Sequence, residues 1–105
     1  MSTPVAINVA VLGSATDLYT AGATLAQLTT LVLTNTTGGD LTIDVWKRNA
    51  GDTTSWFIAA TLGVPANSNR SLSKALVTFT NSGEKLRAQA SGVGIDAVGS
   101  IIENA

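Results

Sequence analysis

Three consecutive segments decide the fold class: Ala26-Gln-Leu-Thr-Thr-Leu-Val-Leu-Thr-Asn35, Thr36-Thr-Gly-Gly-Asp40 and Leu41-Thr-Ile-Asp-Val-Trp-Lys47. The first is rich in β-branched residues and apolar on both faces, as in a central strand of a sandwich. The third alternates, with Leu41, Ile43 and Val45 on one face and Thr42, Asp44 and Trp46 on the other. The middle segment consists of turn-forming residues. We therefore predict two strands joined by a hairpin turn at 36–40.

The same period-two alternation extends in both directions from this stretch. Towards the N-terminus, Val5, Ile7, Val9 and Val11 would share one face, and a short segment follows at Leu18–Thr20. Towards the C-terminus, Ser55–Leu62 aligns Trp56, Ile58, Ala60 and Leu62. Two further strands are expected at Lys85–Ser91 and Ile95–Glu103. Turn-rich segments separate all of these strands.

One segment is ambiguous. Leu72, Ala75, Leu76 and Phe79 also fit the spacing of an amphipathic helix. Thr78-Phe79-Thr80, ahead of the turn at Asn81–Glu84, reads as extended, so strand and loop are preferred there, with one helical turn as the alternative.

This pattern predicts an all-β fold: a β-sandwich, immunoglobulin-like or jelly-roll-like, with about eight short and mostly antiparallel strands. At 105 residues the chain fits a single domain over residues 1–105. Residues 1–16 form either an N-terminal strand or an arm used in assembly, because such a long apolar run can pair with a neighbouring subunit.

The composition points to contact with other subunits. Charged residues make up only 12% of the chain, about half of the usual share, and the net charge is −1. Thr, Ser and Asn stand where Lys and Glu would otherwise cover the surface. Little electrostatic repulsion keeps copies apart, which suits a protein that packs against its neighbours.

Several classes of function are not expected. The chain has no His and no Cys, which removes the common general base, the thiol nucleophile, disulfides and the usual zinc ligands. Six Lys and Arg against seven Asp and Glu form no basic stripe for nucleic acid. The apolar stretch Val5–Leu12 is too short to span a bilayer. We expect no membrane association, no cofactor and no metal.

Two accidental matches to catalytic motifs and one carboxylate pair are set aside. Gly92-Val-Gly-Ile-Asp-Ala97 fits a dinucleotide-binding pattern but lies too near the C-terminus for the helix that must follow. Ser71-Leu-Ser-Lys74 lacks the companion motifs of penicillin-recognising enzymes, and Lys74 is read as a solvated residue. Asp40 and Asp44 are the nearest carboxylate pair, but Asp40 belongs to a turn that favours Asp. The chain is not expected to be an enzyme.

Four strings resemble, in the same order, those of small tailed-bacteriophage virion proteins, in which LYT, L-x-x-x-NT-x-G, PANS and G-(D/E)-x-L-x-AQAS recur. Here they read Asp17-Leu-Tyr-Thr-Ala21, Leu31-Val-Leu-Thr-Asn-Thr-Thr-Gly38, Val64-Pro-Ala-Asn-Ser68 and Gly83-Glu-Lys-Leu-Arg-Ala-Gln-Ala-Ser91. The resemblance spans most of the chain from Asp17 onward. It implies a sandwich in a virion, either a capsid decoration (cement) protein or a tail or tail-fibre component, and it carries no catalytic residue.

The expected function is therefore a decoration protein that stabilises the shell. Its partners would be copies of itself, with a trimer favoured, and the major capsid protein; a small-molecule ligand is not expected. It would be made in the host cytoplasm and reside in the virion, on the capsid surface in preference to the tail. The alternative is a tail or tail-fibre module that recognises a host-surface glycan.

Aromatic residues are few, so each is a candidate contact. The candidate interface residues are Tyr19, Trp46, Trp56 and Phe57. Trp46 falls on the polar face of its strand and is read either as an interface anchor or, if a bulge turns it inward, as a core residue. Trp56 and Phe57 are adjacent and must point to opposite faces.

Overall fold

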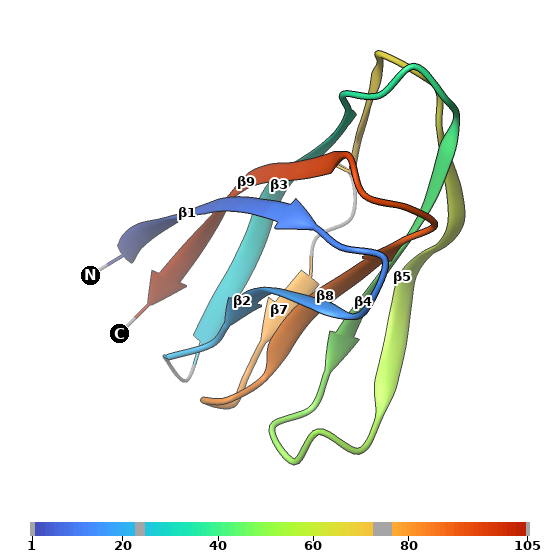
Figure 1. Ribbon diagram of the computed structural model, residues 1–105. Coiled ribbons are helices and arrows are strands. Elements are labelled where there is room, and N and C mark those ends of the chain that lie inside the picture. Colours follow the sequence, from blue (N-terminus) through green and yellow to red (C-terminus); the bar gives the residue numbers. More distant parts are fainter. Residues whose placement is uncertain (1, 23–24, 73–76, 105) are drawn as a thin grey trace.

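The computed structural model describes residues 2–22, 25–72 and 77–104 and contains nine β-strands there (Figure 1). The strands are β1 (Ser2–Val11), β2 (Thr16–Thr20), β3 (Leu25–Asn35), β4 (Leu41–Arg48), β5 (Ser55–Val64), β6 (Asn69–Ser71), β7 (Val77–Phe79), β8 (Lys85–Ala90) and β9 (Ile95–Asn104). The prediction of an all-β fold is confirmed. Within the described residues, no helix is long and apolar enough to cross a membrane.

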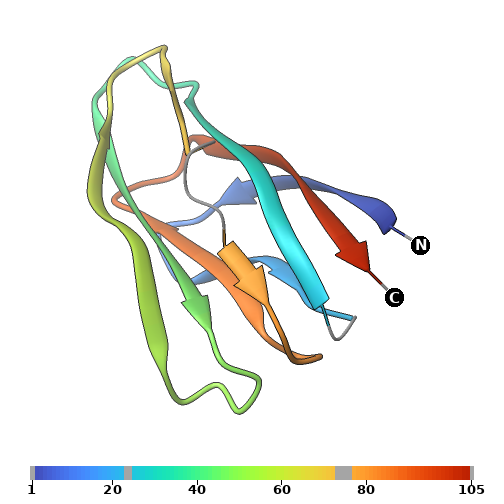
Figure 2. The same cartoon turned by 180° about the vertical axis from the view of Figure 1, so that it is seen from behind.

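The strands form two layers that face each other (Figures 1 and 2). The first sheet has the order β1-β9-β3-β6, and β7 also pairs with β3. The second sheet has the order β2-β8-β4-β5. All pairings between strands are antiparallel. The chain is thus a β-sandwich, as predicted.

The pairing is nested. The first strand pairs with the last (β1 with β9), the second with the last but one (β2 with β8), β3 with the segment β6–β7, and β4 with β5. Counting β6 and β7 as one interrupted strand beside β3 leaves the eight positions of a jelly roll. An immunoglobulin-like sandwich instead pairs its first strand with its second in sheets of order A-B-E-D and C-F-G, so the jelly-roll alternative is the one that the structure adopts.

The prediction of a hairpin at 36–40 was wrong. β3 lies in the first sheet and β4 in the second, so this turn carries the chain across the sandwich. The buried amide of Asn35 holds it. Nδ2 donates to the carbonyls of Gly39 (2.8 Å) and Val64 (3.0 Å), and Oδ1 accepts the N–H (2.9 Å) and the hydroxyl (2.7 Å) of Thr37. Both donor and both acceptor positions of the Asn35 amide are thus used, and a buried polar side chain whose hydrogen bonds are all formed costs little stability.

The core lies between the two sheets and is lined by the inward side chains of both. Its buried members are Ile7, Val11, Leu18, Tyr19, Ala21, Ala26, Leu28, Leu31, Leu33, Ile43, Val45, Val64, Phe79, Leu86, Ala88, Ala90, Ile95, Ala97 and Ile101. The alternation predicted for residues 5–11, 41–45 and 85–91 correctly identifies which side chains face inward.

The alternation predicted for β5 was wrong beyond Ile58. The register with β4 shifts twice, once on each side of Val45, so β5 carries two β-bulges. At the second bulge Thr61 has a positive φ of 53°, and its N–H donates to Oδ1 of Asp44 at 2.5 Å. Ala60 is consequently exposed, whereas Leu62 and Val64 turn back to the core.

The segment that fits either a strand or a helix is only partly described. Val77–Phe79 is strand β7, as expected for its extended end. Residues 73–76 lie outside the described residues, and with them the helical-turn alternative and the reading of Lys74.

Replacing Asn35 by Ala should lower the free energy of unfolding by about 2–4 kcal/mol, because the Thr37 N–H and the carbonyls of Gly39 and the buried Val64 lose their partner. Urea unfolding measures this. Asn69→Ala, the same change on an exposed strand, should alter stability by no more than about 0.5 kcal/mol. Equal effects of the two changes would contradict the role given to Asn35.

A matched pair of strand glycines gives a second prediction. A Cβ on Gly99 would overlap the carbonyl oxygen of Thr30 and lie 3.1 Å from Cα of Leu31, whereas around Gly63 no atom of the described residues lies within 4 Å of such a Cβ. Gly99→Ala should therefore lower the free energy of unfolding by about 1–3 kcal/mol. Gly63→Ala should leave it unchanged or raise it slightly, and thermal unfolding compares the two.

Candidate interface on the second sheet

The candidate interface lies on the outer face of the second sheet, where one row of side chains crosses all four strands. Directly opposite residues share a face, and the register aligns Asp17 with Arg87, Arg87 with Trp46, and Trp46 with Phe57. The neighbours of Arg87 in β8, Leu86 and Ala88, are fully buried and face the core. The row Asp17–Arg87–Trp46–Phe57 therefore faces away from the core.

Trp46 is on the outer face, yet only 9% of its surface is exposed. The ring of Phe57 covers it, with the ring centroids 5.6 Å apart and the planes at 35°. The register does shift beside Trp46, but the shift does not turn the residue inward. Trp46 is thus not part of the core, and a partner would reach it only past Phe57.

Trp56 and Phe57 are the accessible aromatic residues, with 50% and 61% of their surfaces exposed. Phe57 stands on the outer face. Trp56 is aligned with Lys47 and Leu86, which places it in the inner row, at the open margin of the sandwich. Both are exposed because β5 is the edge strand of its sheet (Figures 1 and 2). Their opposite orientations agree with the sequence expectation.

Lys47 fills the space behind Trp56. Its Nζ lies 5.7 Å from the Trp56 ring centroid and 5.6 Å from that of Phe79, donates to the Thr78 carbonyl at 2.8 Å and lies 3.6 Å from Oε1 of Glu84. The cation thus faces both rings and supports Trp56 from the inner side.

Tyr19 is a core residue. Its ring meets that of Phe79 edge-on at 5.4 Å, and its hydroxyl donates to Oε2 of Glu103. Burial, followed by the bond to Glu103 and its charge, raises the pKa of Tyr19 above its usual range. The side chain is buried and offers a partner almost no surface.

The carboxylates are committed to structural contacts. Oδ1 of Asp40 accepts the N–H of Ala66 at 3.0 Å, and Asp44 holds the bulge at Thr61. The buried Glu84 accepts the N–H of Thr80 at 2.7 Å and of Asn81 at 3.3 Å. Within the described part of the chain, no three acidic side chains gather into a group that suits a metal ion.

Two arginines and two aspartates form a network beside the aromatic row. Arg87 bonds Asp17 and reaches Asp52 at 2.9 Å, while Arg48 reaches Asp52 at 2.6 Å. These residues come from β2, β8, β4 and the β4–β5 loop, so no short sequence motif could have predicted the network. Arg48 and then Arg87 hold the pKa of the Asp52 carboxyl below its usual range.

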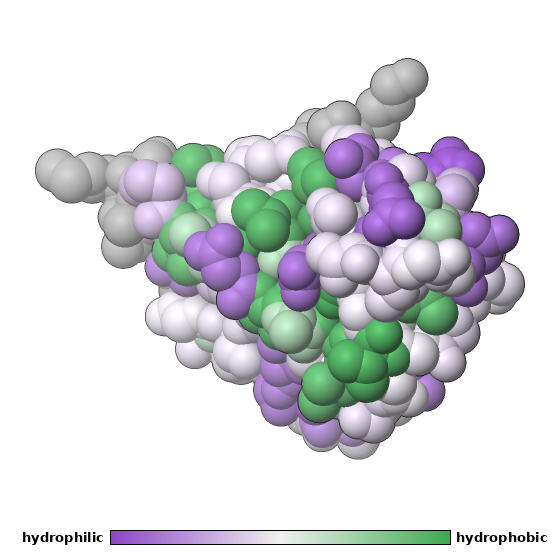
Figure 3. Space-filling view, turned by 45° about the horizontal axis from the view of Figure 1, so that its top comes forward, coloured by the Kyte–Doolittle hydropathy of each residue, from purple (hydrophilic) through white to green (hydrophobic). Residues whose placement is uncertain are grey.

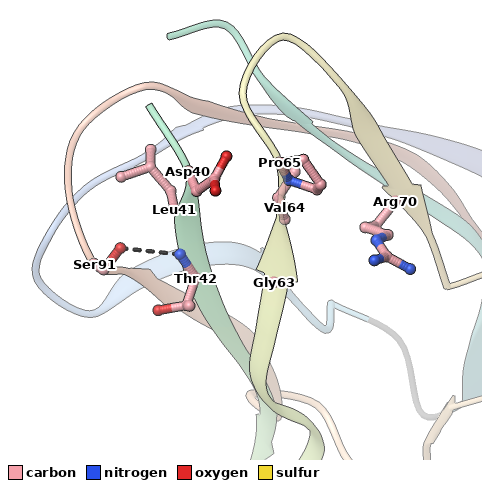
Figure 4. A pocket seen from close by; sticks show the side chains of 8 residues that line it. All are labelled: Asp40, Leu41, Thr42, Gly63, Val64, Pro65, Arg70 and Ser91. Carbon is pink, nitrogen blue, oxygen red and sulfur yellow. Dashed lines mark hydrogen bonds between the residues drawn. The ribbon is translucent and has the colours of Figure 1, made fainter. Parts of the chain in front are cut away.

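A shallow pocket of about 400 Å³ opens at the ends of β4 and β5 (Figure 4). It is lined by Asp40, Leu41, Thr42, Gly63, Val64, Pro65, Arg70 and Ser91. The Thr42 N–H donates to Oγ of Ser91 at 3.0 Å. Because Asp40 is engaged with Ala66, the lining offers apolar contacts and the guanidinium of Arg70, and sequence reasoning had not singled out this grouping.

Exposed apolar side chains are dispersed elsewhere. Leu12, Leu25, Val93 and Val98 are exposed and come from separate parts of the chain. On the face shown in Figure 3, hydrophobic residues form several patches divided by polar ones. The aromatic pair on β5 is therefore a distinct feature of the surface.

Comparisons with known proteins identify the fold. No family model matches the chain, and no curated protein sequence matches it. A solved structure described as "Bacillus endospore appendages form a novel family of disulfide-linked pili" matches with a TM-score of 0.55 and 17% identity over 97% of this chain and 84% of the other. A chain in the structure of infectious bursal disease virus Gx strain matches with a TM-score of 0.58 and 16% identity over 96% of this chain. This chain spans 32% of that viral chain. At such identities the likeness concerns the fold.

The network around Asp52 predicts a pH dependence. Because the folded state lowers the pKa of Asp52 from its ordinary 3.8, its contribution to stability is full above that value and is lost as the pH falls through the lower, folded pKa. The difference in unfolding free energy between wild type and Asp52→Asn should therefore be constant near neutral pH and shrink below about pH 4. Urea unfolding over a pH series measures it; a difference that grows on acidification would contradict the assignment.

Proposed function

We propose that this chain is a non-catalytic structural subunit of a larger assembly. The observation that carries the proposal is the jelly-roll fold, which the chain shares with a spore-appendage pilus protein and with a chain of a virus structure. The low content of charge and the commitment of the carboxylates to backbone and arginine contacts support it. Such a surface suits contact with protein neighbours better than chemistry.

The specific form of the proposal is a capsid decoration protein of a tailed bacteriophage, as the four strings from Asp17 to Ser91 imply. It would associate with copies of itself and bind the major capsid protein on the virion surface. The chain has no Cys, so it cannot form disulfide links between copies, in contrast to the disulfide-linked pili that share its fold.

Trp56 and Phe57 are the proposed anchors of the contact with the shell. They are large, half or more exposed, and held on a strand whose partner side chains Lys47 and Trp46 support them from behind. Rigid aromatic side chains of this kind contribute most to interfaces, because they bury much area at a small cost in entropy.

A second candidate uses the same surface. In a tail or tail-fibre module, the exposed face of Trp56 would stack on a sugar ring of a host-surface glycan. Its half exposure and the neighbouring Ser55 and Lys47 favour this as the alternative. Glycan binding that is lost in Trp56→Ala, with no binding to shells, would select it.

The decoration hypothesis is tested with capsid shells that lack the protein. Purified protein should bind them and raise the temperature at which they are disrupted. The double variant Trp56→Ala, Phe57→Ala should bind about 30-fold more weakly, since anchors of this type contribute about 2 kcal/mol or more. Sedimentation of the protein with the shells measures the affinity.

Leu25→Ala is the control, because Leu25 is a large exposed apolar residue on β3, in the other sheet from β5. It should leave binding unchanged. If the wild-type protein neither binds shells nor alters their heat stability, the decoration hypothesis is wrong.

A further inference from the structure

The four edges of the two sheets differ in how open they are to another strand. β2 has five residues and a register shift between Asp17 and Tyr19. β5 has two bulges, and β6 and β7 have three residues each. Short or bulged edge strands accept a further strand poorly. Within the described residues, three of the four edges are therefore protected.

β1 is the exception. It has ten residues, pairs with β9 without a register shift, and contains no charged residue. Edge strands that avoid association usually carry Lys, Pro or bulges. β1 carries Pro4 alone. The edge is long, regular and uncharged, which is the form that another regular strand can join.

The backbone groups that point to the free edge can be assigned. The Thr36 N–H donates to the Gly94 carbonyl at 2.9 Å, which fixes the even-numbered residues of β9 as those bonded to β3. Odd-numbered residues of β9 then bond the odd-numbered residues of β1. Pro4, Ala6, Asn8 and Ala10 consequently present their backbone to the free edge, which also explains why a proline, lacking an N–H, is tolerated at position 4.

We propose that two copies of this chain pair through β1, antiparallel, about a two-fold axis at Asn8. The inference rests on the proposed role as an assembly subunit and names one contact between copies. A second copy is the matching partner, because its β1 is an equally long, regular and uncharged edge that can extend the ladder.

The register follows from the backbone groups at the two ends of β1. With the axis at Asn8, Pro4 lies opposite Leu12 of the partner copy. Pro4 has no N–H to offer, and the backbone of Leu12 is already engaged: its N–H donates to Oγ1 of Thr16 at 3.1 Å and its carbonyl accepts from Ala90 at 3.0 Å. Between these ends, Ala6 pairs with Ala10, and Asn8 with Asn8, of the partner copy. This register thus leaves no free donor opposite Pro4.

The side chains fit the same register. On the inner face, Ile7 lies opposite Val9, and Val5 opposite Val11, of the partner copy. Val5 and Val9 are partly exposed in the single chain and would be covered. Close pairs of β-branched side chains stabilise antiparallel strands, and no like charges meet on either face. At the centre of the pairing the outer face presents Ala6, Asn8 and Ala10, which are small, and at its ends Pro4 lies opposite Leu12.

Charged residues introduced at the axis test the pairing. The wild-type chain should show a monomer–dimer equilibrium in sedimentation at up to about 1 mM, which detects association as weak as about −4 kcal/mol. Asn8→Lys places like charges opposite each other and should raise the dissociation constant at least tenfold. Mixing Asn8→Lys with Asn8→Asp should restore dimers. Val93→Lys, at an exposed residue of the β8–β9 loop and outside the paired strand, is the control and should dimerise as wild type does.

Single cysteines test the register, because the natural chain has none. Residues opposite each other in a hydrogen-bonded antiparallel pair have Cα atoms about 5.5 Å apart, which suits a disulfide. Under mild oxidation Asn8→Cys should form covalent dimers, whereas Ala6→Cys should do so only when mixed with Ala10→Cys. Val93→Cys should remain largely uncross-linked.

A wild-type chain that stays monomeric at about 1 mM, a trimer unaffected by Asn8→Lys, or equal cross-linking at Asn8 and Val93 would each overturn the proposal. The proposed function fails separately, through absence of binding to shells. Asn8→Lys should still bind shells through Trp56 and Phe57, so the two outcomes are distinguishable.

Discussion

The fold depends on repeated passage of the chain between two sheets, and the buried amide of Asn35 holds the passage from β3 to β4. This one side chain joins the end of β3, the turn at Thr37–Gly39 and the end of β5. It therefore ties together both sheets at one end of the sandwich. The nested order of the other strands follows from such crossings, because each carries the next strand to the opposite layer.

The surface reflects how little charge the chain has to distribute. Arg48, Arg87, Asp17 and Asp52 are gathered into one network on the second sheet, and Lys47 and Glu84 meet at the margin of the core. Long edges therefore receive no protecting lysine. β5 is protected by bulges, whereas β1 is not, and this difference separates an aromatic contact surface from a strand that can be extended.

The strands themselves were largely predictable. Alternation identified β1, β3, β4, β8 and β9, because the inner face of each strand must be apolar when two sheets pack together. The opposite orientations of Trp56 and Phe57 followed from the same rule. The environment of Trp46 was predictable only in part. Alternation placed it on the polar face, but its burial comes from Phe57, which lies beside it only because β4 and β5 pair. Nor could alternation reveal the bulges in β5, which depend on the register with β4.

By itself the sequence determined the class of the fold, the inward faces of most strands and the absence of histidine and cysteine chemistry, since these depend on local periodicity and residue type. Only the tertiary structure decided which strands are neighbours. A turn such as Thr36–Asp40 can close a hairpin or cross a sandwich with the same residues, and the choice rests on contacts such as that of Asn35 with Val64, far away in sequence. The same choice made β1 and β5 edges, and thereby placed the aromatic pair and the open strand on the surface.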